Sequence, residues 1–270
     1  MVSVVIATLG GDLSKTIYSI NNGSLKPDEI IISLPDSSRS ILNSSLHSNL
    51  KLIYANQYGQ VIQRLKGFKE AKGDYVLQVD DDVILDRYCL ENLVNFLKKN
   101  SCKLAASPCL YDLDGNSLYI QQGEKAFAKI YYRLINGKKK FLPGGITLAG
   151  TNLGVTPNNI LGDYIKVQWQ PGGCILHKRN NLYMHNYYPF SGKAYSEDLI
   201  HSFLLRRDGI KLFVLKNAKC STKACMNLLS FKELTSDFKS RRYFVRLADL
   251  SLSRMYIHYF FYLIKKFFKR

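Results

Sequence analysis

The chain has 270 residues and a formal net charge of +17, from 38 Lys and Arg against 21 Asp and Glu. Hydrophobic residues make up 46% of the sequence, enough to form a core, which excludes a wholly disordered chain. The length fits one large α/β domain, or one domain with an appended segment. The basic charge suits ligands that carry phosphate, nucleic acid or anionic lipid, and it does not distinguish among them.

Strand and helix signals alternate through the first half of the chain. In chain order we predict a strand at 2–7, a helix at 12–22, strands at 29–34 and 50–55, a helix at 60–72, a strand at 75–79, a helix at 86–100 capped by Asp86, and a strand at 103–106. This alternation predicts an α/β fold with a mostly parallel sheet and helices on both faces.

The second half of the chain is less regular. Three consecutive lysines and a Pro-Gly-Gly sequence predict a mobile loop at 136–145. A short strand is predicted at 174–177, and a strand at 211–215. Between them, residues 196–207 predict a helix with Ser196 as its N-cap and two acids in its first turn.

The six cysteines form no CxxC pair and no cluster with zinc-ligand spacing, so we expect free thiols in a reducing cytoplasm. No basic segment precedes the apolar run at the start of the sequence, which argues against a signal peptide. No stretch reaches the roughly 18 uninterrupted apolar residues of a membrane-spanning helix. We therefore expect a cytoplasmic protein.

Polar residues follow three of the predicted strands where each strand ends. Thr8 follows the first strand, Asp36 the second, and the run Asp80-Asp81-Asp82 the fourth. In open α/β sheets, ligands bind beyond the carboxyl ends of the strands. We expect these side chains to converge at one edge of the sheet.

The run Asp80-Asp81-Asp82 allows two interpretations. Adjacent carboxylates repel one another, so such a run needs either a cation or solvent. Oxygen ligands on a loop suit Mg²⁺ or Mn²⁺, with diphosphate oxygens completing the coordination shell. The other interpretation is a solvated acidic turn; we favour the metal because the run follows a buried strand in a basic protein.

Two further motifs are weak when taken singly. Glu197-Asp198 opens a predicted helix, where acids are ordinary because they favour the helix dipole, although a carboxylate in a cleft can also act as a general base. Gly172-Gly173 precedes a strand and allows either a tight turn or close approach of the backbone to a ligand.

Taken together and in this order, these features resemble the inverting family 2 glycosyltransferases of the GT-A fold. The resemblance runs from about residue 2 to about residue 215. It rests on the sequence Val-Ser-Val-Val-Ile-Ala-Thr at 2–8, on Gly-Asp-Tyr-Val-Leu at 73–77 leading to the acidic run, on the Gly-Gly-Cys sequence at 172–174, and on the Glu-Asp pair at 197–198.

The resemblance implies a nucleotide-sugar site. In this family the DxD carboxylates hold a divalent metal on the nucleotide diphosphate, which makes Asp80 and Asp82 the metal ligands, with Mn²⁺ or Mg²⁺ as cofactor. Asp80 and Asp81 also become contacts of the donor. Thr8 matches the position that contacts the nucleotide base, and Asp36 lies where an acidic base contact is usual. A UDP-sugar is the favoured donor.

The resemblance also implies the catalytic groups. Asp198 becomes the catalytic base, with Glu197 as its neighbour, and Gly172 and Gly173 line the junction of donor sugar and acceptor. Arg64 allows two interpretations, a contact with the nucleotide or a surface arginine on its helix.

The sequence departs from the family in two places. The family often reads Asp-Asp-Gly-Ser after its second strand, whereas this chain reads Pro-Asp-Ser-Ser at 35–38. The family often has a late histidine near the metal, and this chain has Lys-Cys-Ser at 219–221 instead. The identity of the nucleotide base and a third protein ligand to the metal therefore stay open.

The segment 231–270 is predicted as a basic, aromatic-rich helical tail, separate from a catalytic domain at 1–230. Residues 232–270 hold ten Lys or Arg against three Asp or Glu. A basic helix rich in aromatic residues suits an anionic membrane surface, which here would be the inner face of the cell membrane. The alternative is that the tail packs on the domain or on a second subunit.

The sequence thus predicts a metal-dependent enzyme that moves a sugar with inversion from a nucleotide-sugar donor to a glycan or lipid-linked acceptor, in bacterial surface-polysaccharide or glycolipid synthesis. One alternative is a sugar-phosphate nucleotidyltransferase, although the first loop lacks the basic pair usual there. A second is a non-enzymatic nucleic-acid-binding protein. An acidic run at a strand end repels phosphate, so we expect no nucleic-acid partner.

Overall fold

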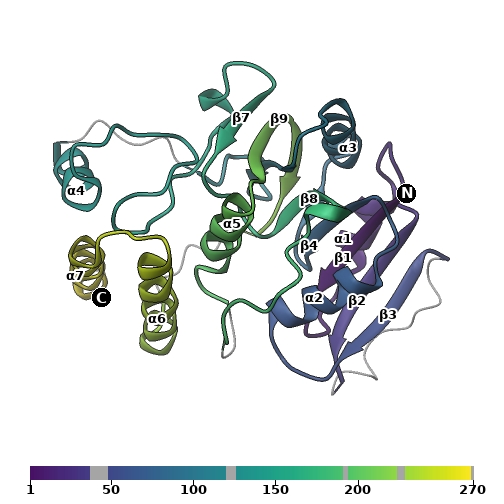
Figure 1. The fold of residues 1–270 in the computed structure, drawn as a ribbon, viewed down its shortest axis with the longest axis horizontal. Coiled ribbons are helices and arrows are strands. Elements are labelled where there is room, and N and C mark those ends of the chain that lie inside the picture. Colours follow the sequence, from purple (N-terminus) through teal and green to yellow (C-terminus); the bar gives the residue numbers. More distant parts are fainter. Residues whose placement is uncertain (37–47, 120–125, 191–193, 224–228, 269–270) are drawn as a thin grey trace.

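The computed structural model describes residues 1–36, 48–119, 126–190, 194–223 and 229–268. These residues form a mixed sheet with the strand order β3-β2-β1-β4-β8-β6-β9-β5, in which β7 pairs with β9 (Figure 1). The strands are β1 Val2–Ala7, β2 Glu29–Pro35, β3 Leu50–Ala55, β4 Tyr75–Asp80, β5 Ile84–Leu85, β6 Leu104–Tyr111, β7 Tyr164–Val167, β8 Cys174–Lys178 and β9 Lys211–Ser221. The helices are α1 Ser14–Asn21, α2 Gln60–Glu70, α3 Cys89–Lys99, α4 Ala126–Asn136, α5 Glu197–Arg207, α6 Phe231–Leu247 and α7 Leu252–Phe268.

The N-terminal half of the sheet is parallel, as the alternation of strands and helices predicts. β1 lies between β2 and β4, with Val4 opposite both Ile30 and Leu77, and all three side chains are fully buried. Helices cover both faces, which explains why these strands are continuous apolar runs rather than alternating patterns. The predicted α/β architecture is confirmed.

The second half of the sheet mixes directions. β8 runs antiparallel to β4 and to β6, whereas β6 and β9 run parallel with a register shift between Pro108 and Cys109. Proline has no N–H to donate to the neighbouring strand, so the register of the pairing shifts next to Pro108. β6 and β9 are both longer than predicted, because they pair again beyond the register shift, up to Tyr111 and Ser221.

One predicted helix start and one predicted capping bond need correction. α3 begins at Cys89, because the Asp86 carboxylate accepts a hydrogen bond from the Tyr88 N–H in a preceding turn. Ser196 does occupy the N-cap position of α5, but its hydroxyl caps nothing there and instead donates to Asp237 Oδ1 at 2.9 Å.

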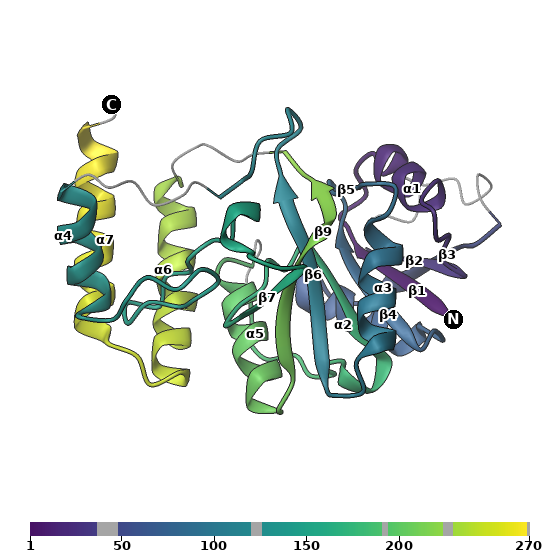
Figure 2. The same ribbon diagram turned by 90° about the horizontal axis from the view of Figure 1, so that it is seen from above.

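The C-terminal helices pack against the rest of the chain on one face. Trp169, Leu199, Phe244, Met255 and Tyr259 belong to one buried hydrophobic cluster that spans both sides of residue 230. Figure 2 shows α4, α6 and α7 together at the end of the molecule, beyond α5. The division at residue 230 stays a prediction, and within the described residues no helix is long and apolar enough to cross a membrane.

Five of the six cysteines lie in the described residues and are free, as predicted. Cys225 lies outside the described residues, as do Ser37 and Ser38 of the turn after β2 and the terminal pair at 269–270.

Candidate active site

A cavity of about 520 Å³ lies at the carboxyl ends of β1 and β4, where the sequence predicts a site. The loop after β1, the start of α2 and the end of β4 form its walls. Its lining residues are Ala7, Thr8, Leu9, Tyr58, Gly59, Gln60, Gln63, Asp80, Asp81 and Asp82.

Thr8 and the acidic run meet in this cavity, as predicted. Thr8 Oγ1 donates to Asp81 Oδ2 at 2.6 Å. Beneath them, the buried Gln63 amide donates to the carbonyls of Thr8 and Ser33, at 2.8 and 2.9 Å, and so joins the ends of β1 and β2. Asp36 follows β2 at the same edge but is exposed and does not line the cavity.

Arg64 of α2 links the acidic run to the start of α5. Its guanidinium donates to Glu197 Oε1 at 3.0 Å and to Asp80 Oδ1 at 3.2 Å. The side chains of Arg64 and Glu197 are each 5% exposed, so the surface interpretation of Arg64 is wrong. Burial opposes the charge of Arg64, but the carboxylates of Glu197 and Asp80 outweigh it and raise the pKa of Arg64.

Tyr187 also contacts Glu197, and neither Tyr187 nor the neighbouring His201 ring adds a positive charge. The Tyr187 hydroxyl donates to Glu197 Oε1, and burial raises the pKa of Tyr187, which keeps it protonated. The ring of His201 is stacked on Tyr187 at 6.0 Å, and burial lowers the pKa of His201 to about 3. Arg64 is therefore the cation that compensates Glu197 in this part of the described structure.

The backbone of Gly172 and Gly173 lies beside the carboxylates of Glu197 and Asp80. The Gly172 carbonyl accepts from the Gln78 amide at 2.6 Å, and the Gly173 carbonyl accepts from the Asp80 N–H at 2.9 Å. A Cβ on Gly172 would lie 2.8 Å from Glu197 Oε2. Glycine is needed at this position because any side chain would displace that buried carboxylate.

Asp198 lies beside the same backbone and is half-buried. A Cβ on Gly172 would lie 3.7 Å from the Cβ of Asp198. Burial, reinforced by the charge of Glu197, raises the pKa of Asp198 to about 7. A carboxylate with this pKa can take up a proton near neutral pH, which suits a general base.

Asp80 and Asp82 of the acidic run are suited to supply part of the coordination shell of a hard divalent cation. Asp80 brings its carboxylate to the cavity wall, and the exposed Asp82 accepts from Thr222 Oγ1 at 3.0 Å. Within the described ranges, no group of three or more His, Cys, Asp and Glu side chains could hold a metal ion. Two carboxylates suit Mg²⁺ or Mn²⁺, because these ions commonly keep water and phosphate oxygens as further ligands.

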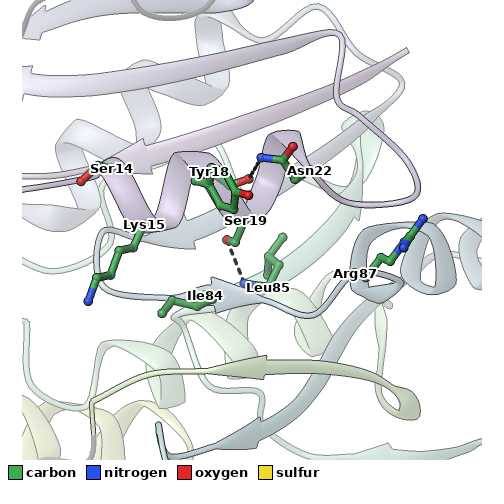
Figure 3. A pocket seen from close by; sticks show the side chains of 8 residues that line it. All are labelled: Ser14, Lys15, Tyr18, Ser19, Asn22, Ile84, Leu85 and Arg87. Carbon is green, nitrogen blue, oxygen red and sulfur yellow. Dashed lines mark hydrogen bonds between the residues drawn. The ribbon is translucent and has the colours of Figure 1, made fainter.

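A second cavity, of about 600 Å³, lies along α1 (Figure 3). The close-up shows the Ser19 hydroxyl oxygen accepting from the Leu85 N–H, at 3.0 Å, with Lys15 and Arg87 at opposite ends. No carboxylate lines this cavity, and it shares no lining residue with the acid-lined one. It therefore lacks the ligands for the predicted metal chemistry.

Sequence reasoning missed Tyr187 and Thr222, and it left two interpretations of Arg64 open. The helix pattern of α2 held a signal for the burial of Arg64, since Val61, Arg64 and Phe68 share one helical face. Tyr187 lies in an irregular segment and gave no signal. Thr222 lies directly after β9, so pairing of β9 with β5 brings it to Asp82.

Comparison with known proteins identifies the family of the chain. A model of the family described as Glycosyl transferase family 2 matches residues 3–150, more than half of the chain, which confirms the resemblance drawn from the sequence. No curated protein matches the chain.

Two solved structures resemble the fold. One is the crystal structure of GalNAc-T7 with UDP, GalNAc and Mn²⁺, with a TM-score of 0.61 and 17% identity over 82% of this chain and 43% of that one. The other is S. aureus TarS 1–349, with a TM-score of 0.52 and 14% identity over 94% of this chain and 68% of that one. This chain thus spans less than half the length of the GalNAc-T7 chain. At these identities the likenesses show the fold alone.

Proposed function

Because the chain belongs to glycosyl transferase family 2 and has the GT-A fold, we propose that it transfers a sugar from a nucleotide-sugar donor to an acceptor hydroxyl, with inversion. One observation carries the proposal. Arg64 holds Asp80, at the wall of the acid-lined cavity, and Glu197, next to Asp198, in a single buried ion-pair network. This network supports a donor site beside a candidate base.

The donor occupies the acid-lined cavity in this proposal. Thr8 and Asp81 lie toward the nucleotide, and Asp80 and Asp82 hold Mn²⁺ or Mg²⁺. When bound, the metal ion neutralises charge that develops on the departing diphosphate. A UDP-sugar is favoured, and the presence of UDP and Mn²⁺ in the GalNAc-T7 structure supports this choice. Asp36 stays a predicted contact of the base.

Arg64 is a positioning residue in this proposal. Both ends of its guanidinium hold carboxylates, which fixes Asp80 and Glu197 relative to each other. Gly172 and Gly173 line the junction of donor sugar and acceptor in this proposal, and their lack of side chains leaves the Glu197 and Asp80 carboxylates undisturbed.

Asp198 acts as the general base. It takes the proton from the acceptor hydroxyl as the oxygen attacks the anomeric carbon on the face opposite the diphosphate. The new carbon–oxygen bond forms while the bond to the leaving phosphate oxygen breaks, so configuration inverts in one displacement. The raised pKa of Asp198 supports this role.

The acceptor is a glycan or a lipid-linked saccharide in bacterial surface-polysaccharide or glycolipid synthesis. The nucleotidyltransferase and nucleic-acid-binding alternatives receive less support, because the family match covers the predicted donor-binding half.

The test is nucleotide release from a panel of UDP-, GDP-, CDP- and dTDP-sugars with Mn²⁺, Mg²⁺ or EDTA. We expect release from one donor and its loss in EDTA. Asp198→Asn is expected to lower turnover roughly 100- to 10,000-fold while donor affinity stays unchanged. Asp208→Asn, an exposed change at the other end of α5, is the matched control.

Asp82→Ala tests the metal site separately. We expect weaker metal-dependent nucleotide binding, whereas Asp114→Ala at an exposed turn leaves binding unchanged. No release from any donor, together with no metal-dependent nucleotide binding, would overturn the proposed function.

A further inference from the structure

The outer face of α7 is a stripe of exposed apolar side chains. Tyr256, Phe260, Ile264 and Phe267 follow one another at intervals of four, four and three residues, and so lie along one line of the helix. Phe260 is 60% exposed and Phe267 63% exposed, whereas Met255 and Tyr259 on the inner face are buried. This spacing gives α7 an apolar outer side that stays largely exposed in the described structure.

The outer face of α6 is cationic. Lys232, Lys239, Arg242 and Arg246 are all exposed and recur along one side of the helix. Within the described part of the chain, none of the four forms an ion pair with a carboxylate. Their charge is therefore available to an external anionic partner.

The apolar stripe of α7 and the cationic stripe of α6 adjoin. Phe238, which precedes Lys239 on α6, stacks on Tyr256 at 6.0 Å between ring centroids. The two helices are also joined inside by Tyr259, whose hydroxyl donates to Asp237 at 2.6 Å. Figure 2 shows α6 and α7 side by side at the end of the molecule, away from the sheet. We call the exposed rings of α7 and the exposed cations of the adjoining α6 the α6–α7 face.

We propose that the α6–α7 face docks on an anionic lipid surface, with the rings of α7 at the level of the headgroups and the cations of α6 on lipid phosphates. Amphipathic helices bind membrane interfaces by this combination of buried apolar area and electrostatic attraction. Aromatic rings suit the interface because they tolerate both its apolar and its wet side.

The arrangement of charge disfavours a second copy of this chain as the occupant. A two-fold dimer uses the same patch on both subunits, so two cationic stripes would approach each other. An anionic lipid surface covers the rings and compensates the four cations at the same time. The inference concerns binding alone and does not depend on sugar transfer.

The experiment is flotation of the full chain with phosphatidylcholine vesicles, with or without 30% phosphatidylglycerol, at low and high salt. We expect binding to the anionic vesicles that weakens as salt rises. A variant with Lys239→Gln, Arg242→Gln and Arg246→Gln removes three cations. Each contributes about fivefold near such a surface, so the partition coefficient is expected to fall roughly 100-fold.

The control for charge is Lys98→Gln, Lys99→Gln and Lys103→Gln, which removes three exposed cations at and beside α3. This control is expected to bind nearly as the parent does, although its net charge equals that of the α6 variant.

A second variant, Phe260→Ser with Phe267→Ser, tests the rings. We expect it to lose affinity but to keep the salt dependence of binding, because the cations remain. Its control is Leu113→Ser with Leu161→Ser, two exposed apolar residues outside the α6–α7 face. The fluorescence of the buried Trp169 checks that every variant is folded.

Three results would overturn the inference. The first is that the parent chain does not prefer anionic vesicles at low salt. The second is that the α6 variant and its control bind equally. The third is that the chain self-associates without binding vesicles, and that Phe260→Ser with Phe267→Ser abolishes this association. The last result would assign the face to a second copy.

Discussion

Replacing Arg64 with methionine tests the buried network on which the site depends. Arg64 is the cation between Asp80 and Glu197, and its side chain is almost fully buried. Arg64→Met keeps an unbranched, helix-compatible side chain but removes all five N–H donors. The variant then holds two carboxylates close together with no compensating charge.

The expected cost is about 3–5 kcal/mol, the range measured when one partner of a buried ion pair is removed. This is a large fraction of the roughly 5–15 kcal/mol that stabilises a typical folded domain. Urea unfolding at pH 7.5 measures it, with the fluorescence of Trp169 as the signal. Trp169 is the chain's one tryptophan and is 3% exposed, so unfolding changes its environment.

A double variant separates loss of the charge pair from loss of packing. Glu197→Gln removes one of the two carboxylates, so Arg64→Met with Glu197→Gln is expected to be at least ~1 kcal/mol less destabilised than the sum of the single changes. Arg207→Met, on the exposed side of α5, is the matched control and is expected to change stability by less than ~0.5 kcal/mol. A cost for Arg64→Met below ~1 kcal/mol, or additivity of the two changes, would refute the reasoning.

Two further predictions concern the backbone and the base. Gly172→Ala places a Cβ 2.8 Å from Glu197 Oε2 and is expected to destabilise the fold by about 1–3 kcal/mol in the urea assay. Gly11→Ala, the control, has open space around its Cβ and is expected to leave stability unchanged. Equal costs for the two changes would contradict this account. Asp198 must be deprotonated to act as the base, and its pKa in the ligand-free chain is raised to about 7, so kcat/KM is expected to fall as the pH drops through 7 and to be roughly tenfold lower at pH 6 than on its alkaline plateau. A rate independent of pH between 6 and 8 would remove Asp198 from this role.

The parallel half of the fold could be predicted because its central strands β1, β2 and β4 are almost entirely buried. Side chains such as Val4 and Ile30 have no solvent-facing alternative, so the sequence shows continuous apolar runs that only a covered sheet accommodates. The convergence of Thr8 with the acidic run followed from the direction of the strands alone. The irregular pairing of β6 with β9 was not predictable, since its register depends on a displacement at Pro108.

The candidate site was only partly predictable, because its contacts join distant segments. Asp80, Asp198 and the two glycines stand out by motif, but nothing local indicates that Arg64 lies between Asp80 and Glu197. A charged residue on an apolar helical face is the one available signal, and the partner that compensates it is visible only in the fold. Tyr187 shows the limit, since an irregular segment has no periodicity from which to infer burial.

The C-terminal helices and the start of α5 form one hydrogen-bonded unit. Ser196 has a φ of 56°, a left-handed conformation that is uncommon for serine, and its hydroxyl is held by Asp237 of α6. Burial alone would raise the pKa of Asp237, but Arg241 and the Tyr259 hydroxyl outweigh it, so the carboxylate stays charged and holds all three donors. These bonds tie α6 and α7 to the turn immediately before the Glu-Asp pair. Changes to the inner face of α6 are therefore expected to affect catalysis, and changes to the α6–α7 face to affect only membrane binding.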